Sequence, residues 1–228
     1  MAAKENKRDN SAGIFYGMYI LSMLLFGTNG YLVAHISLQS SQIVLVRTLI
    51  GGLVLSALVL LQKDFALHKI KSEFRNLLAG GVALGLNWVA LFAAYRMLNV
   101  SLATLIYYAG PMLVLLFSPW LFRETLTKRK LAAILIVAVG LLSITGSIAA
   151  GRLSMAGLIT AIASALFYAA LIVFNKRIHN TSGLQTAAIE LDVAFVVVLL
   201  YVLFTSGFSY PLAADIPYLL VIGLLNTG

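Results

Sequence analysis

Long uncharged stretches constrain the fold of this chain more than any other feature. Seven of them are about as long as a helix that crosses the hydrocarbon core of a bilayer, which takes about 20 apolar residues. We expect spans at 14–36, 43–61, 77–98, 102–122, 131–149, 155–174 and 184–205. An eighth apolar run begins near Tyr218 and continues to Gly228. The predicted fold class is an all-α polytopic membrane protein with seven full spans and part of an eighth.

The composition excludes an ordinary soluble domain. Hydrophobic residues make up 61% of the 228 residues and charged residues 11%, whereas about 25% of a typical soluble domain is charged. The chain has no cysteine, and its three histidines lie far apart at span ends or in loops. It contains no H-E-x-x-H, Walker or G-x-S-x-G motif. We therefore expect no enzyme, no cofactor and no metal site.

The basic residues predict the orientation of the chain. Lys and Arg concentrate in the cytoplasmic loops of membrane proteins. The tail at 1–12 and the loops after the second, fourth and sixth spans carry 13 of them, whereas the loops on the other side carry 2. We expect a cytoplasmic amino terminus and a location in a bacterial plasma membrane. Orientation and anionic lipid account for the net charge of +8 without nucleic acid as a partner.

Three motifs recur at spacings of 142 or 143 residues. SMLLFG (22–27) resembles SALFYA (164–169), SQIVLVR (41–47) resembles LQTAAIE (184–190), and LLAGGVALG (77–85) resembles LLVIGLLNTG (219–228). The pattern predicts a duplication of five helices, with units at 13–150 and 151–228. Because five is odd, the second unit is inverted, as in many secondary transporters. By the same spacing, about 63 residues of the second unit would follow Gly228.

Two segments carry a resemblance to a known family. They are VLVRTLIGGLVL around Arg47 and GPMLVLLFSPWLFRETLT with Pro111 and Glu124. The chain resembles the EamA-type proteins of the drug/metabolite transporter superfamily, which have ten helices in two inverted five-helix repeats. The resemblance covers essentially the whole chain. Two departures stand out: Glu190 takes the repeat position of Arg47, and no second proline–glutamate turn occurs.

Pro111 and Glu124 are the predicted structural or gating residues. Pro111 lacks an amide hydrogen and should kink the fourth span one to two turns from its start. Such a break is tolerated where neighbouring helices or a polar cavity satisfy the freed backbone groups. Glu124 falls just past the cytoplasmic end of this span, and Thr127 is a candidate N-cap for the next helix.

Charged residues inside spans are candidates for function. Arg47 lies about one turn inside the second span and could hold an anionic group of a substrate. Alternatively it reaches the interface or ties its helix to a loop carbonyl. Glu190 lies about two turns inside the seventh span and could carry a coupling proton, unless that span begins near Val193 and leaves it among the headgroups. Inversion places these two residues near opposite faces, so we expect no pairing between them.

Uncharged polar and aromatic side chains complete the candidate substrate site. Asn87 and Trp88 lie in the middle of the third span, and Asn29 lies in the first. An amide at that depth either joins two helices or contacts a substrate. Aromatic rings in the fourth and sixth spans could line a pocket or pack in the core; they are Tyr107, Tyr108 and Tyr168.

These features together predict a secondary transporter that moves a small metabolite or drug by alternating access. The alternative is a truncated product that is inactive alone or needs a partner chain. The expected partners are membrane lipid and a small-molecule substrate, with a second copy or a complementing chain as candidate protein partners.

Overall fold

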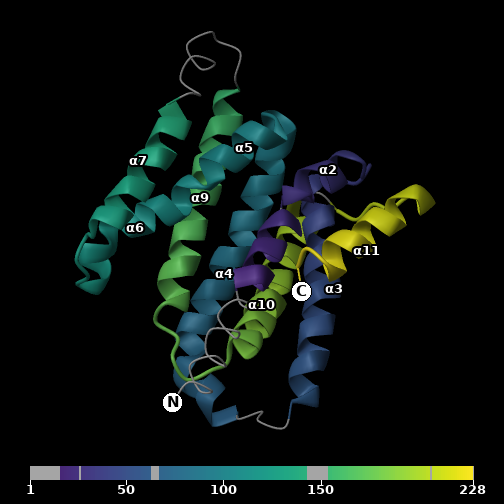
Figure 1. Ribbon diagram of the computed structural model, residues 1–228. Helices are drawn as coiled ribbons and strands as arrows, with labels where there is room; N and C mark the ends of the chain where they lie inside the picture. Colours follow the sequence, from purple (N-terminus) through teal and green to yellow (C-terminus); the bar gives the residue numbers. More distant parts are fainter. Residues whose placement is uncertain (1–15, 26, 63–66, 143–153, 206, 228) are drawn as a thin grey trace.

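The computed structural model describes residues 16–25, 27–62, 67–142, 154–205 and 207–227, and their regular structure is helical (Figure 1). Residues 16–25 form one helical stretch. The labelled elements are α2 (Asn29–Ala34), α3 (Ser40–Leu61), α4 (Leu67–Met97), α5 (Val100–Tyr107), α6 (Ala109–Phe122), α7 (Lys128–Leu142), α9 (Met155–Asn175), α10 (Gly183–Thr205), η1 (Ala213–Asp215) and α11 (Ile216–Leu224). The prediction of an all-helical fold is confirmed for the described residues.

Six helices in the described residues are long and apolar enough to cross a membrane. They are Tyr16–Ala34, Ser40–Leu61, His68–Met97, Val100–Phe122, Met155–Asn175 and Gly183–Thr205, with Ala213–Leu224 as a shorter apolar helix. The fifth predicted span, 131–149, corresponds to α7, which is described for 15 residues. The rest of that span lies outside the described residues, as do the basic tail, Lys63 and Arg152.

The third span begins earlier than predicted. Its charged first turns suggested a start at residue 77, but α4 begins at Leu67 and runs for 31 residues. Lys69, Lys71 and Arg75 are exposed there. A helix can carry such residues where it leaves the hydrocarbon core, because their charges remain in water.

Side-chain caps fix where several helices begin. The Asn99 side chain accepts a hydrogen bond from the Leu102 amide at 2.8 Å and starts α5 directly after α4. Thr127 Oγ1 accepts from the Lys130 amide at 3.3 Å, in agreement with its predicted role before α7. Such caps satisfy amide hydrogens that the first turn of a helix leaves free.

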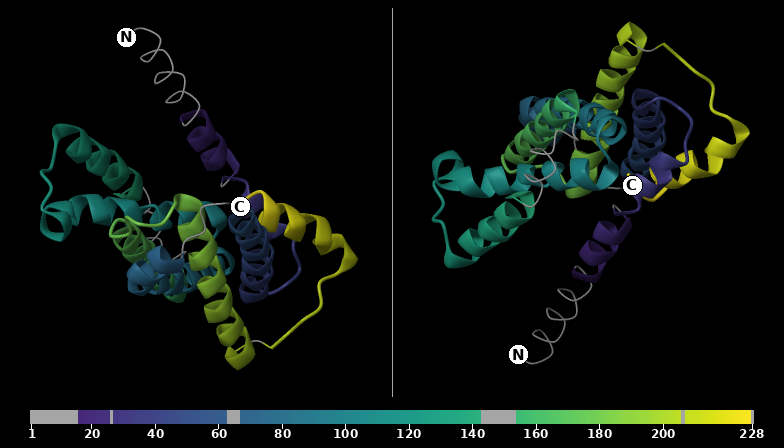
Figure 2. Two further views of the ribbon diagram at one scale, coloured as in Figure 1. Left: turned by 90° about the horizontal axis from the view of Figure 1, so that it is seen from below. Right: turned by 90° about the horizontal axis from the view of Figure 1, so that it is seen from above.

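The helix α4 lies at the centre of the bundle. It packs against α9 and α10, while α3 packs against α10 and carries α11 on another face. The hairpin of α6 and α7 extends to one side of this core and α11 to the other (Figure 2). The inward residues of α3, α4, α9 and α10 form one apolar cluster.

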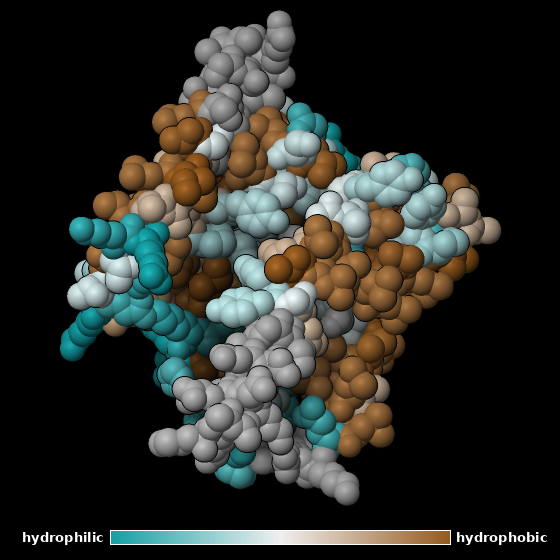
Figure 3. Space-filling model, viewed as in Figure 1, coloured by the Kyte–Doolittle hydropathy of each residue, from teal (hydrophilic) through white to brown (hydrophobic). Residues whose placement is uncertain are grey.

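The outer surface is apolar over much of the molecule. Leu61 is 81% exposed and Phe204 85% exposed, and hydrophobic side chains cover the side of α3 and α11 in Figure 3. Basic residues gather where α3 ends, α4 begins and the α6–α7 and α9–α10 connections lie (Figure 1); we call this the basic end. A lipid-facing belt with one basic end is typical of a multi-pass membrane protein.

Two glycine contacts recur at the spacing of the sequence motifs. A Cβ at Gly81 would lie 2.8 Å from the carbonyl oxygen of Glu190 and would press on Val193. A Cβ at Gly223 would lie 2.8 Å from Cβ of Ile50. Gly223 follows Gly81 by 142 residues and Val193 follows Ile50 by 143, so both members of the contact recur at the spacing of the predicted repeat.

Two acidic side chains make a second recurring contact. Glu73 Oε1 accepts hydrogen bonds from the His179 amide at 3.2 Å and from Asn180 Nδ2 at 2.8 Å. Asp215 accepts from the Ser37 amide at 3.0 Å and from Ser37 Oγ at 2.6 Å. Asp215 follows Glu73 by 142 residues, and His179 follows Ser37 by the same number. We call these contacts the acid–loop tethers; the Glu73 tether lies at the basic end and the Asp215 tether at the opposite end.

Candidate functional site

An aromatic cavity of about 670 Å³ lies between α4, α6, α7 and α9. Trp88 projects from α4, Tyr107 ends α5, Tyr108 follows it, and Tyr168 projects from α9. The rings of Tyr107 and Tyr168 stack with their centroids 4.5 Å apart and their planes within 2°. None of the described residues lining the cavity is charged. Four of the predicted substrate residues therefore share one site.

The cavity owes its shape to a break in the fourth span. This span divides into α5 and α6 at Tyr108, and Pro111 is the third residue of α6. The prediction of a kink near Pro111 is refined, because proline is tolerated in a first turn where amide hydrogens lack helical partners. Gly110 allows the close approach that follows, since a Cβ there would lie 2.7 Å from the Ala165 carbonyl oxygen of α9.

Arg47 is buried inside the bundle with 1% of its surface exposed. Its Nε donates to Thr227 Oγ1 at 2.9 Å and its Nη2 donates to the Asn226 carbonyl oxygen at 2.8 Å. The guanidinium carbon lies 4.0 Å from the centroid of the Trp88 ring. The arginine thus does not reach the interface; it ties α3 to the segment after α11 and stacks on Trp88, whose ring also borders the cavity.

Asn29 joins the same cluster from the first span. It is buried, and its Oδ1 accepts a hydrogen bond from Asn226 Nδ2 at 3.0 Å. Sequence reasoning missed Asn226 and Thr227, although their polarity at the end of an apolar run is a usable signal. The structure therefore brings Asn29, Arg47 and Trp88 together around residues 226–227.

Asn87 is fully buried between α4 and α9. Its Oδ1 accepts a hydrogen bond from Ser164 Oγ at 3.3 Å, which joins the two helices. The side chain also forms a hydrogen bond with Tyr107 of the aromatic cavity. Of the two predicted roles, helix joining is observed.

Glu190 lies inside α10, which begins at Gly183 and not near Val193. The residue is 4% exposed. Its Oε2 accepts from Asn175 Nδ2 at 3.2 Å, whereas its Oε1 is buried without a hydrogen-bond partner in the described residues. It borders a pocket of about 380 Å³ at the basic end. Arg47 and Glu190 have different partners, as expected.

Glu124 links the α6–α7 turn to α9. It forms ion pairs with Lys130, at 2.7 Å, and with Lys176. Hydrogen bonds from these two ammonium groups lower the pKa of the Glu124 carboxyl to about 2. Lys176 also lies 4.0 Å above the Phe122 ring. The predicted turn at the end of the fourth span therefore joins the two predicted units.

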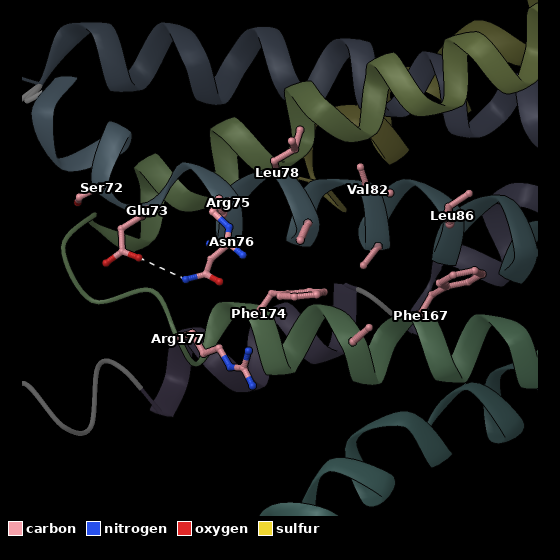
Figure 4. Close-up of a pocket in the computed structure, with 13 residues that line it drawn as sticks. Ser72, Glu73, Arg75, Asn76, Leu78, Val82, Leu86, Phe167, Phe174 and Arg177 are labelled. Carbon is pink, nitrogen blue, oxygen red and sulfur yellow. Dashed lines mark hydrogen bonds between the residues drawn. The ribbon is translucent and has the colours of Figure 1, made fainter. Parts of the chain in front are cut away.

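A second groove, of about 930 Å³, runs between α4 and α9 (Figure 4). Glu73, Asn76 and Arg177 lie near its end at the basic side, and Leu86 and Phe167 lie along its apolar length. Sequence reasoning singled out none of its lining residues as a site. The aromatic cavity remains the candidate site, because four of the predicted substrate residues line it and none lines this groove.

Comparison with known proteins gives two matches. The model of the EamA-like transporter family matches residues 12–146. The uncharacterized transporter YxxF of Bacillus subtilis (strain 168) is 30% identical over 213 residues, which is 92% of this chain and 68% of the relative. No solved structure matches the chain.

Proposed function

Because the chain belongs to the EamA-like transporter family, we propose that it is a secondary transporter moving a small organic metabolite or drug across the plasma membrane of a bacterium. The family membership and the six apolar helices support a membrane transporter. The aromatic cavity is the observation that carries the substrate site. Its volume of about 670 Å³ falls within the range of small-molecule pockets.

The lining of the cavity favours a substrate with an uncharged planar or apolar part. Stacked tyrosines and the Trp88 ring present flat faces, and offset stacking on such rings is favourable. The Arg47 guanidinium lies against Trp88 and adds positive charge behind that wall, which disfavours a cationic group there. Asn87 lies beside these residues and forms a hydrogen bond with Tyr107.

Inverted repeats at 13–150 and 151–228 would give this site alternating access. Two observations support such repeats: the equivalent glycine contacts at Gly81 and Gly223, and the two acid–loop tethers at opposite ends. In transporters of this architecture, one bundle of helices moves against another around a site near the bilayer midplane. With the basic end in the cytoplasm, the Glu73 tether lies inside and the Asp215 tether outside.

Tryptophan fluorescence tests the substrate site directly. The chain has two tryptophans, and Trp120 is 83% exposed on the outer surface. In W120F, Trp88 is the remaining tryptophan, so a ligand in the aromatic cavity should quench or shift its emission in a saturable way. W88F, which keeps Trp120, is the matched control and should give no saturable change.

Compounds that change the Trp88 emission of W120F are then tested for transport by counterflow in proteoliposomes. Saturable uptake that W88A reduces would support the proposal. If compounds are transported while Trp88 emission stays unchanged in W120F, the substrate site lies elsewhere.

A further inference from the structure

The Glu190 carboxylate is buried and forms no ion pair in the described residues. The side chain is almost fully buried, and one of its two oxygens has no hydrogen-bond partner in the described residues. Burying an ionised carboxylate without compensation is costly, so such a group binds a proton or a cation. Carboxylates inside spans commonly mark ion or proton sites for the same reason.

Several charged groups on the neighbouring helices are engaged elsewhere, and Lys69, Lys71 and Arg75 on α4 are exposed. On α3, Arg47 donates to residues 226 and 227. On α9, Lys176 pairs with Glu124, and on α4 Glu73 accepts from the α9–α10 loop. Two residues along α10, Asp192 accepts from Ser56 Oγ at 2.7 Å on an exposed face. In the part of the chain that the structure describes, no ion pair involves Glu190.

The Glu190 carboxylate packs directly against Gly80. A Cβ at this glycine would collide with Oε1 of Glu190 and would lie 3.5 Å from Oδ1 of Asn175. The Asn175 amide nitrogen donates to the other carboxylate oxygen. Gly80 therefore leaves room for the carboxylate itself, and Oε1 stays an acceptor without a donor in the described residues, which suits a proton or a hard cation.

A path from the basic end leads to this position. The 380 Å³ pocket beside Glu190 is lined by Asn175, Ile178 and Thr181 before α10 and by the first turns of α10, including Thr186. Asn175 is exposed. The lining contains no lysine or arginine that would repel a cation.

We propose that the Glu190 carboxylate, held by Asn175 and packed against Gly80, binds a monovalent cation, a proton or a sodium ion, and that this ion drives transport. The coupling role rests on the proposed function, whereas the binding site does not. Because the pocket opens at the basic end, the site is loaded from the cytoplasm in the conformation described here.

Infrared difference spectroscopy of the purified chain in nanodiscs tests the site without a substrate. In sodium-free buffer, a proton site gives a protonated-carboxyl band that disappears as the pH rises. At constant pH, a sodium site gives a change in the carboxylate bands on adding sodium chloride but not choline chloride. E190Q should lose the response completely, and D192N, the matched control on the same helix, should keep it.

The variant G80A tests the position of the carboxylate. Its methyl group would collide with Oε1 of Glu190 and push the carboxylate away from α4, so the response to the ion should weaken or shift. A response equal to that of the native chain would overturn the placement of the carboxylate against Gly80.

The cation site and the transporter proposal fail separately. No response to either ion, or an equal response in E190Q, overturns the cation site even if Trp88 fluorescence demonstrates substrate binding. Conversely, cation binding with no transported substrate would leave the site standing and reject the transporter proposal.

Discussion

At the scale of single residues, Arg47 shows how the bundle holds a buried charge. Its two hydrogen bonds go to uncharged oxygens, and its plane lies on the Trp88 ring. This combination suits the flat, multidentate guanidinium and not a lysine ammonium. The sequence predicted a functional arginine or a tie to a loop carbonyl, and the tie is observed.

The substitution R47K should therefore destabilise the chain. Loss of the second charged hydrogen bond and of stacking should lower the free energy of unfolding by about 1.5–3 kcal/mol. Denaturation in detergent micelles measures this change. R75K, at an exposed position on α4, is the control and should leave stability unchanged; an equally stable R47K would contradict the assigned role.

The ion pairs of Glu124 predict a pH dependence. The pKa of this carboxyl is lowered to about 2 by Lys130 and Lys176. A lowered pKa stabilises the folded state fully above the usual value of about 4.5, and this stabilisation is lost as the pH falls through about 2. The gap in thermal stability between the native chain and E124Q should thus stay constant from pH 7 to 5 and shrink at lower pH. A gap that closes between pH 7 and 5 would mean that the two ammonium groups do not hold this carboxylate.

At the scale of helices, the spans could be predicted because length and hydropathy alone determine them. The positions at which a span breaks into two helices could not be predicted in this way. Pro111 marked the region of one break, but its position at Tyr108 depends on how α6 packs against α9. The turn at Thr28 in the first span carries no proline signal, and its geometry is tied to residue 226 through hydrogen bonds.

The contact of α6 with α9 gives a test at this scale. In G110A, the added methyl group would lie 2.7 Å from the Ala165 carbonyl oxygen, which is backbone and cannot move aside. Such overpacking should cost about 1–3 kcal/mol of stability and weaken ligand quenching of Trp88. G140A is the matched helical control, because its methyl group would meet Leu105 at an ordinary 3.9 Å. Equal stability of the two variants would contradict the close approach.

The candidate site was partly predictable from the sequence. Trp88, Tyr107, Tyr108 and Tyr168 were each singled out by type and depth, but the sequence does not show which helices are neighbours. Only the packing of α4 and α5 against α9 places their rings around one cavity. The same limit explains why the partners of Arg47, 180 residues along the chain, were missed.

At the scale of the whole molecule, the closest packing joins helices from different predicted units. The central helix α4 packs along α9 and α10, and α11 packs on α3. Separating these pairs would expose large contact surfaces and break the acid–loop tethers as well. We therefore expect each moving body to contain helices of both units, with the tethers closed throughout the transport cycle.

Cysteine cross-links test this expectation, because the native chain has no cysteine. The pairs S37C with D215C and E73C with H179C replace the two tethers at opposite ends of the bundle. Joining either pair with a short thiol-specific cross-linker should leave counterflow of an identified substrate within about twofold of the unlinked sample. The reason is that both residues of each pair belong to the same moving body. The unlinked double variants control for loss of the native hydrogen bonds. The opposite result with a cleavable cross-linker would be that counterflow stops on linking and returns on cleavage. That result would mean that the linked tether opens during transport. The moving bodies would then separate where α4 or α11 meets the other predicted unit.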